Sequence, residues 1–116
     1  MMKKRYYLYI MTNLQNSMLY TGITDNLPRR VFVYKNKLIK DFATRFNLSK
    51  LVYYEVFQDA FQAIYRQKQL KSGPRNLKIH LIESKNPNWK DLYHWSFVKK
   101  PLPLKDDFIS HPPVNG

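Results

Sequence analysis

The sequence predicts a small α+β domain in which helices flank a three-stranded sheet. Two segments rich in aromatic and aliphatic residues, 6–11 and 18–24, predict an N-terminal β-hairpin, and a similar segment at 50–57 predicts a third strand. Helical patterns follow the second and the third strand. The order is strand, strand, helix, strand, helix, helix, for which we expect a mixed sheet.

The predicted hairpin has a polar connection. Residues 12–17 are typical of a turn, and they separate the two strand-like segments. Within the second strand, Gly22 indicates a β-bulge or a close approach of another backbone. We therefore expect the two strands to lie side by side, with the glycine as the irregular point.

The first predicted helix begins after a capping residue, either Asp25 or Asn26, and has Pro28 in its first turn. We expect it to run to about Lys37. Three of its residues fall at helical spacing on one face: Val31, Tyr34 and Leu38. The next segment, 41–49, predicts an irregular connection or a short helical turn anchored by Phe42 and Phe46.

The second predicted helix covers residues 60–71 and is capped by Asp59. We expect its apolar positions to face the sheet, namely Phe61, Ile64 and Leu70. The run Ser72-Gly73-Pro74 ends this helix. A third helix at 76–83 follows, and we expect four of its residues to be partly buried: Leu77, Ile79, Leu81 and Ile82.

The C-terminal part of the chain changes in composition. Residues 86–92 predict a turn that leads into a final short element, and four of the seven prolines lie between residues 101 and 113. We therefore expect one folded domain at residues 1–95 and an extended, proline-rich tail at 96–116. A length of 116 residues suits one domain with a modest core.

The charge of the chain favours a polyanionic partner. Lysine and arginine number 20 against 8 acidic residues, which gives a net charge of +12. We expect DNA, whether structured, nicked or single-stranded, with RNA as an alternative. No apolar run approaches the ~20 residues of a membrane span, so no membrane partner is expected. We also expect no small-molecule cofactor. The absence of cysteine excludes disulfides and thiolate metal sites and, with no secretory leader, favours the cytoplasm.

Two tyrosines and an arginine pair are the first candidates for chemistry. Tyr9 and Tyr20 fall on the neighbouring strands of the hairpin, and Arg29 and Arg30 open the following helix. A phenol acts as a base only where nearby cations lower its pKa, and guanidinium groups suit a phosphate. With nine tyrosines in the chain, a role for either one in the core is the alternative.

The combination of motifs resembles the GIY-YIG nuclease superfamily, in particular its small single-domain bacterial branch. The hairpin of that branch reads Tyr-Val-Tyr-Ile and Leu-Tyr-Ile-Gly, followed by Leu-x-x-Arg. Its helix reads Ala-Ile-x-Arg-Glu-Lys-Gln-Leu-Lys, and its close reads Asn-Pro-x-Trp-x-Asp-Leu. The matching segments here are Tyr7-Leu8-Tyr9, Tyr20-Thr21-Gly22, Arg30, residues 63–71 and residues 86–92.

This resemblance implies hydrolysis of a phosphodiester with one divalent cation, Mg²⁺ or Mn²⁺. Tyr20 would act as the general base, and Tyr9 would support it from the neighbouring strand. Arg30 would stabilise charge on the phosphate, and Tyr34 would contact the phosphate or the leaving group. A glutamate on the later helix would hold the cation.

Gln67 stands where the family has that metal-binding glutamate. Three alternatives are therefore open: a non-catalytic relative that binds nucleic acid or a protein partner, an enzyme that uses another carboxylate or Gln67 itself, and a chain with a deliberate Glu→Gln substitution. Glu55 and Glu83 are the candidate replacement carboxylates in that half of the chain. The three histidines show no zinc-ligand spacing.

The remaining candidates would bind nucleic acid rather than react with it. Basic side chains contact phosphates and position the partner without reading its sequence, although solvated charge is the alternative. The expected nucleic-acid-binding residues are Gly22, Arg29, Lys35, Arg66, Lys68, Lys71 and Arg75, and Lys78 lies in the same basic helix region.

Overall fold

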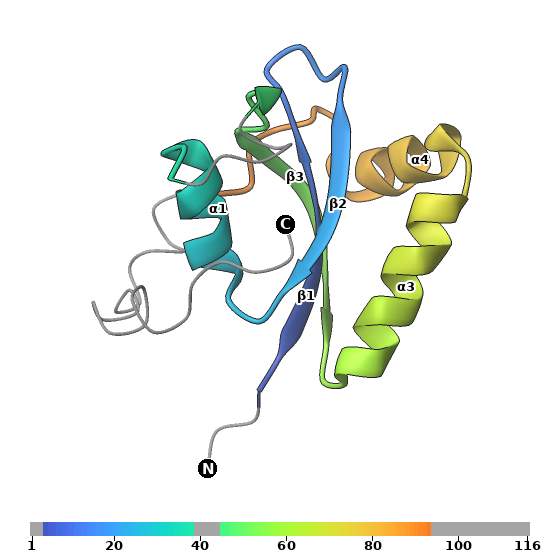
Figure 1. Ribbon diagram of the computed structural model, residues 1–116. Coiled ribbons are helices and arrows are strands. Elements are labelled where there is room, and N and C mark those ends of the chain that lie inside the picture. Colours follow the sequence, from blue (N-terminus) through green and yellow to red (C-terminus); the bar gives the residue numbers. More distant parts are fainter. Residues whose placement is uncertain (1–3, 39–44, 94–116) are drawn as a thin grey trace.

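The computed structural model describes residues 4–38 and 45–93. Its strands and helices are β1 (Tyr6–Thr12), β2 (Leu19–Thr24), α1 (Leu27–Lys35), β3 (Lys50–Phe57), α3 (Ala60–Ser72) and α4 (Arg75–Lys85). Figure 1 shows α1 on one side of the sheet and α3 with α4 on the other. The α+β prediction is therefore confirmed. Phe42, the final short element and the proline-rich tail lie outside the described residues.

The sheet has the order β2-β1-β3, and β1 pairs antiparallel with both neighbours. The expectation of a mixed sheet is wrong, because β3 pairs with β1 and not with β2. The connection through α1 returns the chain so that β3 runs in the direction of β2, and both therefore oppose the central strand.

The register of the hairpin is regular. Tyr9 lies opposite Gly22 and Met11 opposite Tyr20, with no shift along the pair. The bulge predicted at Gly22 is wrong, because the irregularity falls on the other side of β1, between Ile10 and Met11 where it pairs with β3. Gly22 is instead a buried position in an unbroken ladder.

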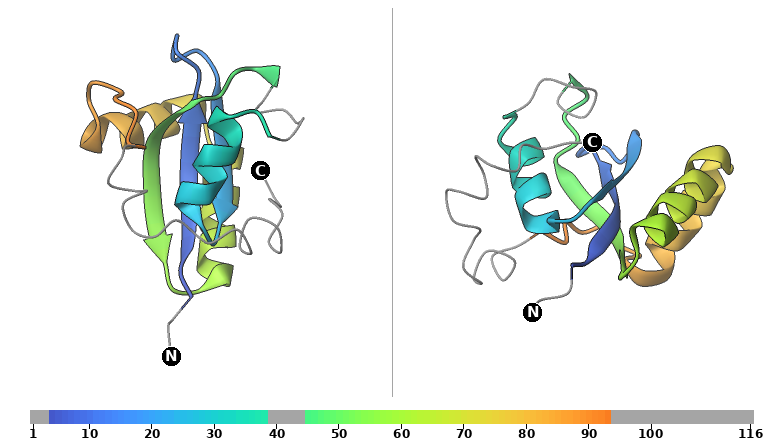
Figure 2. Two further views of the ribbon diagram at one scale, coloured as in Figure 1. Left: turned by 90° about the vertical axis from the view of Figure 1, so that its left-hand side faces the viewer. Right: turned by 60° about the horizontal axis from the view of Figure 1, so that its bottom comes forward.

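Alternation along β1 divides the core between the two faces of the sheet. Tyr9 and Met11 pack with residues of α1 and with Leu48 and Leu51. Leu8 and Ile10 face the other way and pack with residues of α3 and α4. The two views of Figure 2 show these layers from other directions. The sheet is thus covered on both faces, and its edge strand β2 lies between the two helical layers.

Helix α1 is fixed at both ends. The Asn26 side chain accepts a hydrogen bond from the backbone N–H of Arg29 at 3.2 Å, as the capping prediction requires. The helix ends at Lys35, and Lys37 has a φ of 53°, in the left-handed region. Val31 and Tyr34 are buried as one face, but Leu38 lies beyond the helix and is 59 % exposed. The placement of Leu38 on that face is therefore wrong.

Helix α3 turns a different face to the sheet from the one expected. Ala63 and Leu70 are fully buried, whereas Phe61 is 80 % and Ile64 36 % exposed. The assignment of Phe61 and Ile64 to the core is wrong because the small side chain of Ala63 allows the helix to approach the sheet. Asp59 caps the helix and Gly73 ends it, as predicted. Phe46 is similarly exposed, and its neighbour Leu48 is buried instead.

Helix α4 and the segment after it complete the second layer. Ile82 is fully buried, and Leu77, Ile79 and Leu81 are partly buried as predicted. The chain then follows β3: the Leu92 N–H donates to the Leu51 carbonyl at 2.7 Å, and the Asn86 side chain donates to the Val52 carbonyl at 3.1 Å. Within the described ranges, no helix is long and apolar enough to cross a bilayer.

Candidate active site

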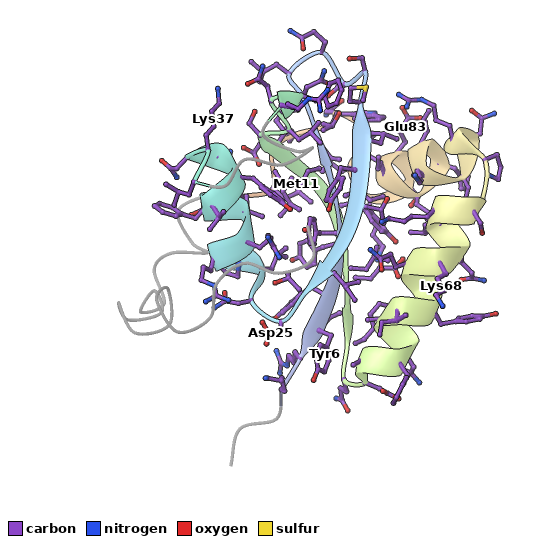
Figure 3. All side chains as sticks on the ribbon, in the orientation of Figure 1. Tyr6, Met11, Asp25, Lys37, Lys68 and Glu83 are labelled. Atoms are coloured by element: carbon purple, nitrogen blue, oxygen red, sulfur yellow. The ribbon has the colours of Figure 1, made fainter. Side chains whose placement is uncertain are left out.

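Three tyrosines and an arginine converge between α1 and the hairpin. The ring centroids of Tyr9 and Tyr20 are 6.4 Å apart, and those of Tyr20 and Tyr34 are 6.2 Å apart with the rings nearly perpendicular. The guanidinium carbon of Arg30 lies 5.4 Å from the centre of the Tyr34 ring. Figure 3 shows side chains filling the space between α1 and the sheet. The structure thus brings together all four residues that were predicted to be catalytic.

The register of the hairpin and the period of helix α1 produce this convergence. Tyr9 and Tyr20 point to the same face because Tyr20 pairs with Met11, which lies two residues from Tyr9 and shares its side of the pleat. Arg30 and Tyr34 are four residues apart on α1 and therefore lie on one face of the helix. The cap at Asn26 fixes where that face begins.

The environments of the two hairpin tyrosines differ. Tyr9 is fully buried, whereas Tyr20 on the edge strand is half-buried. Burial, followed by the charge and hydrogen bond of Tyr34, raises the pKa of Tyr9 well above its usual value, and the nearby Arg30 only partly opposes this. The Tyr9 hydroxyl is thus protonated at neutral pH. Burial opposes ionisation of the Tyr9 phenol.

Helix α3 reaches the same region from the opposite face of the sheet. The Nε2 of Gln67 donates to the carbonyl of Thr21 at 3.3 Å, and the Nζ of Lys71 lies 5.8 Å from the centre of the Tyr20 ring. These contacts are made across the edge strand β2. The site therefore lies around that edge, with α1 on one side and α3 on the other.

The side chains around this edge do not fit a magnesium site. Among residues 4–38 and 45–93, no three acidic, histidine or cysteine side chains are grouped to hold a metal. The side chain of Gln67 is a neutral amide whose nitrogen donates a hydrogen bond to the Thr21 carbonyl. Mg²⁺, in contrast, depends on carboxylate charge when it has few protein ligands. The position that the family resemblance assigns to the metal ligand is thus occupied by a group with little affinity for the cation.

The two candidate replacement carboxylates serve other contacts. Glu55 accepts hydrogen bonds from Arg66 Nε at 2.9 Å and Arg66 Nη2 at 3.0 Å, and it also accepts from the Tyr53 hydroxyl. Glu83 accepts from the indole N–H of Trp89 at 2.9 Å. Glu55 therefore does not lie freely exposed on β3, and it belongs to an ion pair on the flank of α3 away from Gln67.

Beside Lys71, two further cations continue the basic surface. Arg75 Nη2 donates to the Ser17 carbonyl at 3.1 Å, which places it at the hairpin turn. Burial, and then repulsion from Lys71 and Arg75, lowers the pKa of Lys78. None of these three side chains forms a salt bridge with a carboxylate of the described residues. Together they concentrate positive charge next to Tyr20.

Other predicted binding residues lie elsewhere or make structural contacts. Lys35 forms an ion pair with Asp91, and its Nζ lies 5.3 Å from the centre of the Tyr93 ring. Arg66 is held by Glu55. Arg29 is 6 % exposed. Gly22, two residues after Tyr20 on β2, pairs with Tyr9 of β1. Of the set, Lys68 and Lys71 project from the exposed side of α3.

The fold and this edge site define a small, nuclease-like α+β domain. A family model described as the GIY-YIG catalytic domain matches residues 5–79. The chain is 35% identical over 80 residues to a UPF0213 protein of Clostridium perfringens, a match that covers 69% of this chain and 85% of the relative. The chain belongs to the GIY-YIG family.

Two further relatives carry the same description. A UPF0213 protein of Staphylococcus haemolyticus is 34% identical over 82 residues, covering 70% of this chain and 98% of the relative. The solution NMR structure of a UPF0213 protein from Bacillus halodurans is similar with a TM-score of 0.47 and 20% identity, covering 75% of this chain and 92% of that one. The family model and the two sequence relatives confirm, at the level of the family, the resemblance predicted from the motifs.

Proposed function

We propose that this protein binds DNA around the edge strand β2 and that Gln67 leaves it with little Mg²⁺-dependent phosphodiester hydrolysis. The observation that supports this proposal is the convergence of Arg30 and Lys71 on the tyrosine cluster, with a neutral amide in place of a carboxylate. Members of the GIY-YIG family act on nucleic acids and generally use a divalent metal. On this proposal the chain keeps the nucleic-acid binding of the family and lacks most of its metal-dependent hydrolysis.

The chain's own residues suffice for phosphate recognition. Lys71 lies against the half-buried Tyr20 ring from the α3 side, and on the α1 side Arg30, 3 % exposed, lies against Tyr34, whose ring is next to Tyr20. A phosphate at this edge would thus meet Lys71 directly, with the charge of Arg30 close behind the tyrosines. Phenol hydroxyls can donate further hydrogen bonds to phosphate oxygens. Such contacts hold the backbone of a nucleic acid without selecting its sequence.

The substitution Gln67→Glu tests the catalytic half of the proposal. A carboxylate on this turn of α3 would supply the charge that Mg²⁺ requires, so we expect the variant to gain Mg²⁺-dependent cleavage of DNA over the parent chain. Cleavage of branched, nicked and single-stranded DNA, with and without Mg²⁺, is the measurement. A rise of at least about tenfold is expected, since one metal contributes several kcal/mol to charge stabilisation.

Gln58→Glu is the matched control. This glutamine is exposed in the turn between β3 and α3 and does not line the α3 pocket, so a carboxylate there adds the same charge away from Tyr20. Adding Tyr20→Phe to Gln67→Glu is expected to remove the gained activity. Equal and substantial cleavage by the parent chain and by Gln67→Glu would falsify the assignment of position 67.

Binding is tested separately from cleavage. The parent chain is expected to bind DNA in the absence of Mg²⁺, measured by fluorescence anisotropy, and to lose affinity steeply as salt rises. A chain that binds no nucleic acid at low salt would instead act through a protein partner. RNA of the same length in the same titration distinguishes the two nucleic acids.

A further inference from the structure

Helix α3 exposes two aromatic side chains that the core does not use. Phe61 is 80 % and Tyr65 68 % exposed, although both belong to a well-formed helix. Single exposed apolar residues are common, but neighbouring large aromatics on one surface indicate an interaction site. The sequence pattern assigns Phe61 to the core. Phe61 and Tyr65 are four residues apart, a spacing that places both side chains on one side of the helix.

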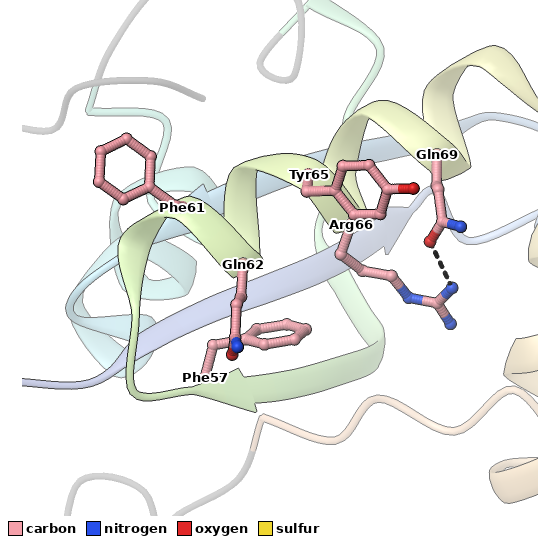
Figure 4. A pocket seen from close by; sticks show the side chains of 6 residues that line it. All are labelled: Phe57, Phe61, Gln62, Tyr65, Arg66 and Gln69. Carbon is pink, nitrogen blue, oxygen red and sulfur yellow. Dashed lines mark hydrogen bonds between the residues drawn. The ribbon is translucent and has the colours of Figure 1, made fainter.

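These aromatics belong to a surface pocket of about 370 Å³ between α3 and the end of β3. Figure 4 shows the six side chains that line it: Phe57, Phe61, Gln62, Tyr65, Arg66 and Gln69. Arg66 Nη1 donates to the side-chain Oε1 of Gln69 at 3.1 Å, which holds one wall of the pocket in place. Aromatic faces beside amide groups are the combination that stacks an unpaired base and bonds its edge.

An unbroken line of side chains leads from this pocket to the candidate active site. Phe61, Tyr65, Lys68 and Lys71 follow one another at intervals of four, three and three residues, so each is a neighbour of the next on the helix surface. Lys71 then lies 5.8 Å from the Tyr20 ring. At 1.5 Å per residue the line is about 15 Å long.

The charge of the residues along this line favours binding of a polyanion over binding of a second copy of this chain. The sequence of α3 contains no acidic residue, and the nearest carboxylate of β3, Glu55, is paired with Arg66. A second copy would bring another +12 of net charge against Lys68 and Lys71. A nucleic acid supplies both the negative charge for the lysines and the flat rings for the aromatics.

We propose that single-stranded nucleic acid lies along this line, with its phosphates on Lys68 and Lys71 and unpaired bases stacked on Tyr65 and Phe61. The proposal rests on the proposed function, because it extends the phosphate-binding edge at Tyr20 to a second, base-binding surface. It restricts the partner to molecules with unpaired bases beside the phosphate site. Paired bases in a duplex would not be free to stack there.

Two oligonucleotides of equal charge test the base contacts. One is a labelled single strand of about 10 nucleotides, within the usual site size for such surfaces, and the other has the same length but abasic sugars. The full chain is expected to bind the base-bearing strand more tightly, by anisotropy in the absence of Mg²⁺. Phe61→Ala and Tyr65→Ala are each expected to weaken that binding about tenfold and to leave abasic binding unchanged.

The controls separate stacking from other effects. Tyr65→Phe keeps the ring and is expected to keep the affinity, and Leu14→Ala removes another side chain with 72 % exposure without effect. Lys71→Ala is expected to weaken both oligonucleotides alike. Because Phe61 and Tyr65 are mostly exposed, their truncation leaves the core intact.

Three results would overturn the proposal, and they are distinguishable. If the abasic and base-bearing strands bind equally and Phe61→Ala changes neither, the aromatics do not contact bases, while the phosphate site stands. If neither strand binds at low salt, the proposed function itself fails. If sedimentation shows a dimer that Phe61→Ala dissociates, the pocket is an interface between copies of the chain.

Discussion

At the scale of single residues, Arg66 and Gln67 are adjacent in sequence but serve opposite flanks of α3. Arg66 is held by Glu55 on β3, whereas Gln67 bonds to Thr21 on β2. Successive helical residues are separated by about 100° around the axis, so neighbours in a chain can reach different strands. Arg66, beside the candidate metal position, is therefore a structural partner of β3, whereas Lys71, one turn after Gln67, lies next to Tyr20.

The Glu55–Arg66 pair makes stability sensitive to acid. Burial tends to raise the pKa of Glu55, but hydrogen bonds from Arg66 and Tyr53 and the charge of Arg66 outweigh it and hold the pKa below its usual value. Since the folded-state pKa is lowered, the contribution to stability is present above the unfolded value and is lost as the pH falls through the folded value.

The substitution Glu55→Gln is therefore expected to lower the free energy of unfolding at neutral pH by about 1–2 kcal/mol. The loss should shrink towards acid pH, where the parent Glu55 is itself protonated. Urea unfolding at a series of pH values measures both effects. Glu83→Gln, which removes an exposed charge but keeps an acceptor for Trp89, is the control and should change stability little. A pH-independent difference between Glu55→Gln and the parent would contradict this interpretation.

At the scale of elements, the cap of α1 positions the arginine of the site. Asn26 accepts from the Arg29 N–H at 3.2 Å, one residue before Arg30. Asn26→Ala is expected to lower the free energy of unfolding by about 1 kcal/mol, the usual value of such a cap. Chemical denaturation measures it, with the exposed Asn76→Ala on α4 as the control. A loss equal to that of the control would mean that the cap does not stabilise α1.

The elements that the sequence predicted well are those with local signals. The hairpin, β3 and the ends of α1 and α3 follow from aromatic-rich runs, capping side chains and Gly73, all of which act within a few residues. The convergence of Tyr9, Tyr20 and Arg30 came from the family resemblance, because spacing alone does not fix which side of the strand each occupies.

The elements predicted wrongly depend on distant contacts. The partner of β3 is set by the path of the whole chain, and no residue in 50–57 encodes it. For α3, hydrophobicity suggested that Phe61 and Ile64 face the sheet, whereas close packing selected Ala63 and Leu70. An aromatic residue that binds a partner has the same sequence signal as one in the core, and only burial separates the two.

At the scale of the whole molecule, a group of cations that pair with no carboxylate of the described residues lies beside β2. Lys71, Arg75 and Lys78 form no salt bridge within the described part of the chain, whereas Lys35 and Arg66 are both neutralised by carboxylates. The first three of these cations thus lie together near Tyr20 and the hairpin turn. Burial, and then repulsion from Lys71 and Arg75, lowers the pKa of Lys78, and a bound polyanion would relieve the repulsion.

This distribution predicts a steep salt dependence of DNA binding. The logarithm of the affinity should fall linearly with the logarithm of the salt concentration, and Lys71→Ala or Lys78→Ala should each reduce the slope by about one unit. Anisotropy titrations at several salt concentrations provide the measurement. Lys90→Ala, an exposed lysine in the segment along β3, is the control and should keep the slope. Unchanged slopes in Lys71→Ala and Lys78→Ala would place the DNA on another surface.

The hydrogen bonds from residues 86–92 to β3 also affect how readily the sheet can pair with another chain. Leu92 and Asn86 occupy the carbonyls of Leu51 and Val52, and the Asp91 carboxylate accepts from the Leu51 N–H at 3.1 Å. An outer strand with open backbone groups is a template for further strands and hence for aggregation. The segment 86–92 that covers these groups lies beyond residues 5–79, which match the family model. A fragment cut to that match would leave these backbone groups of β3 open to pairing with another chain, so we expect residues 86–92 to limit edge-to-edge association of the sheet.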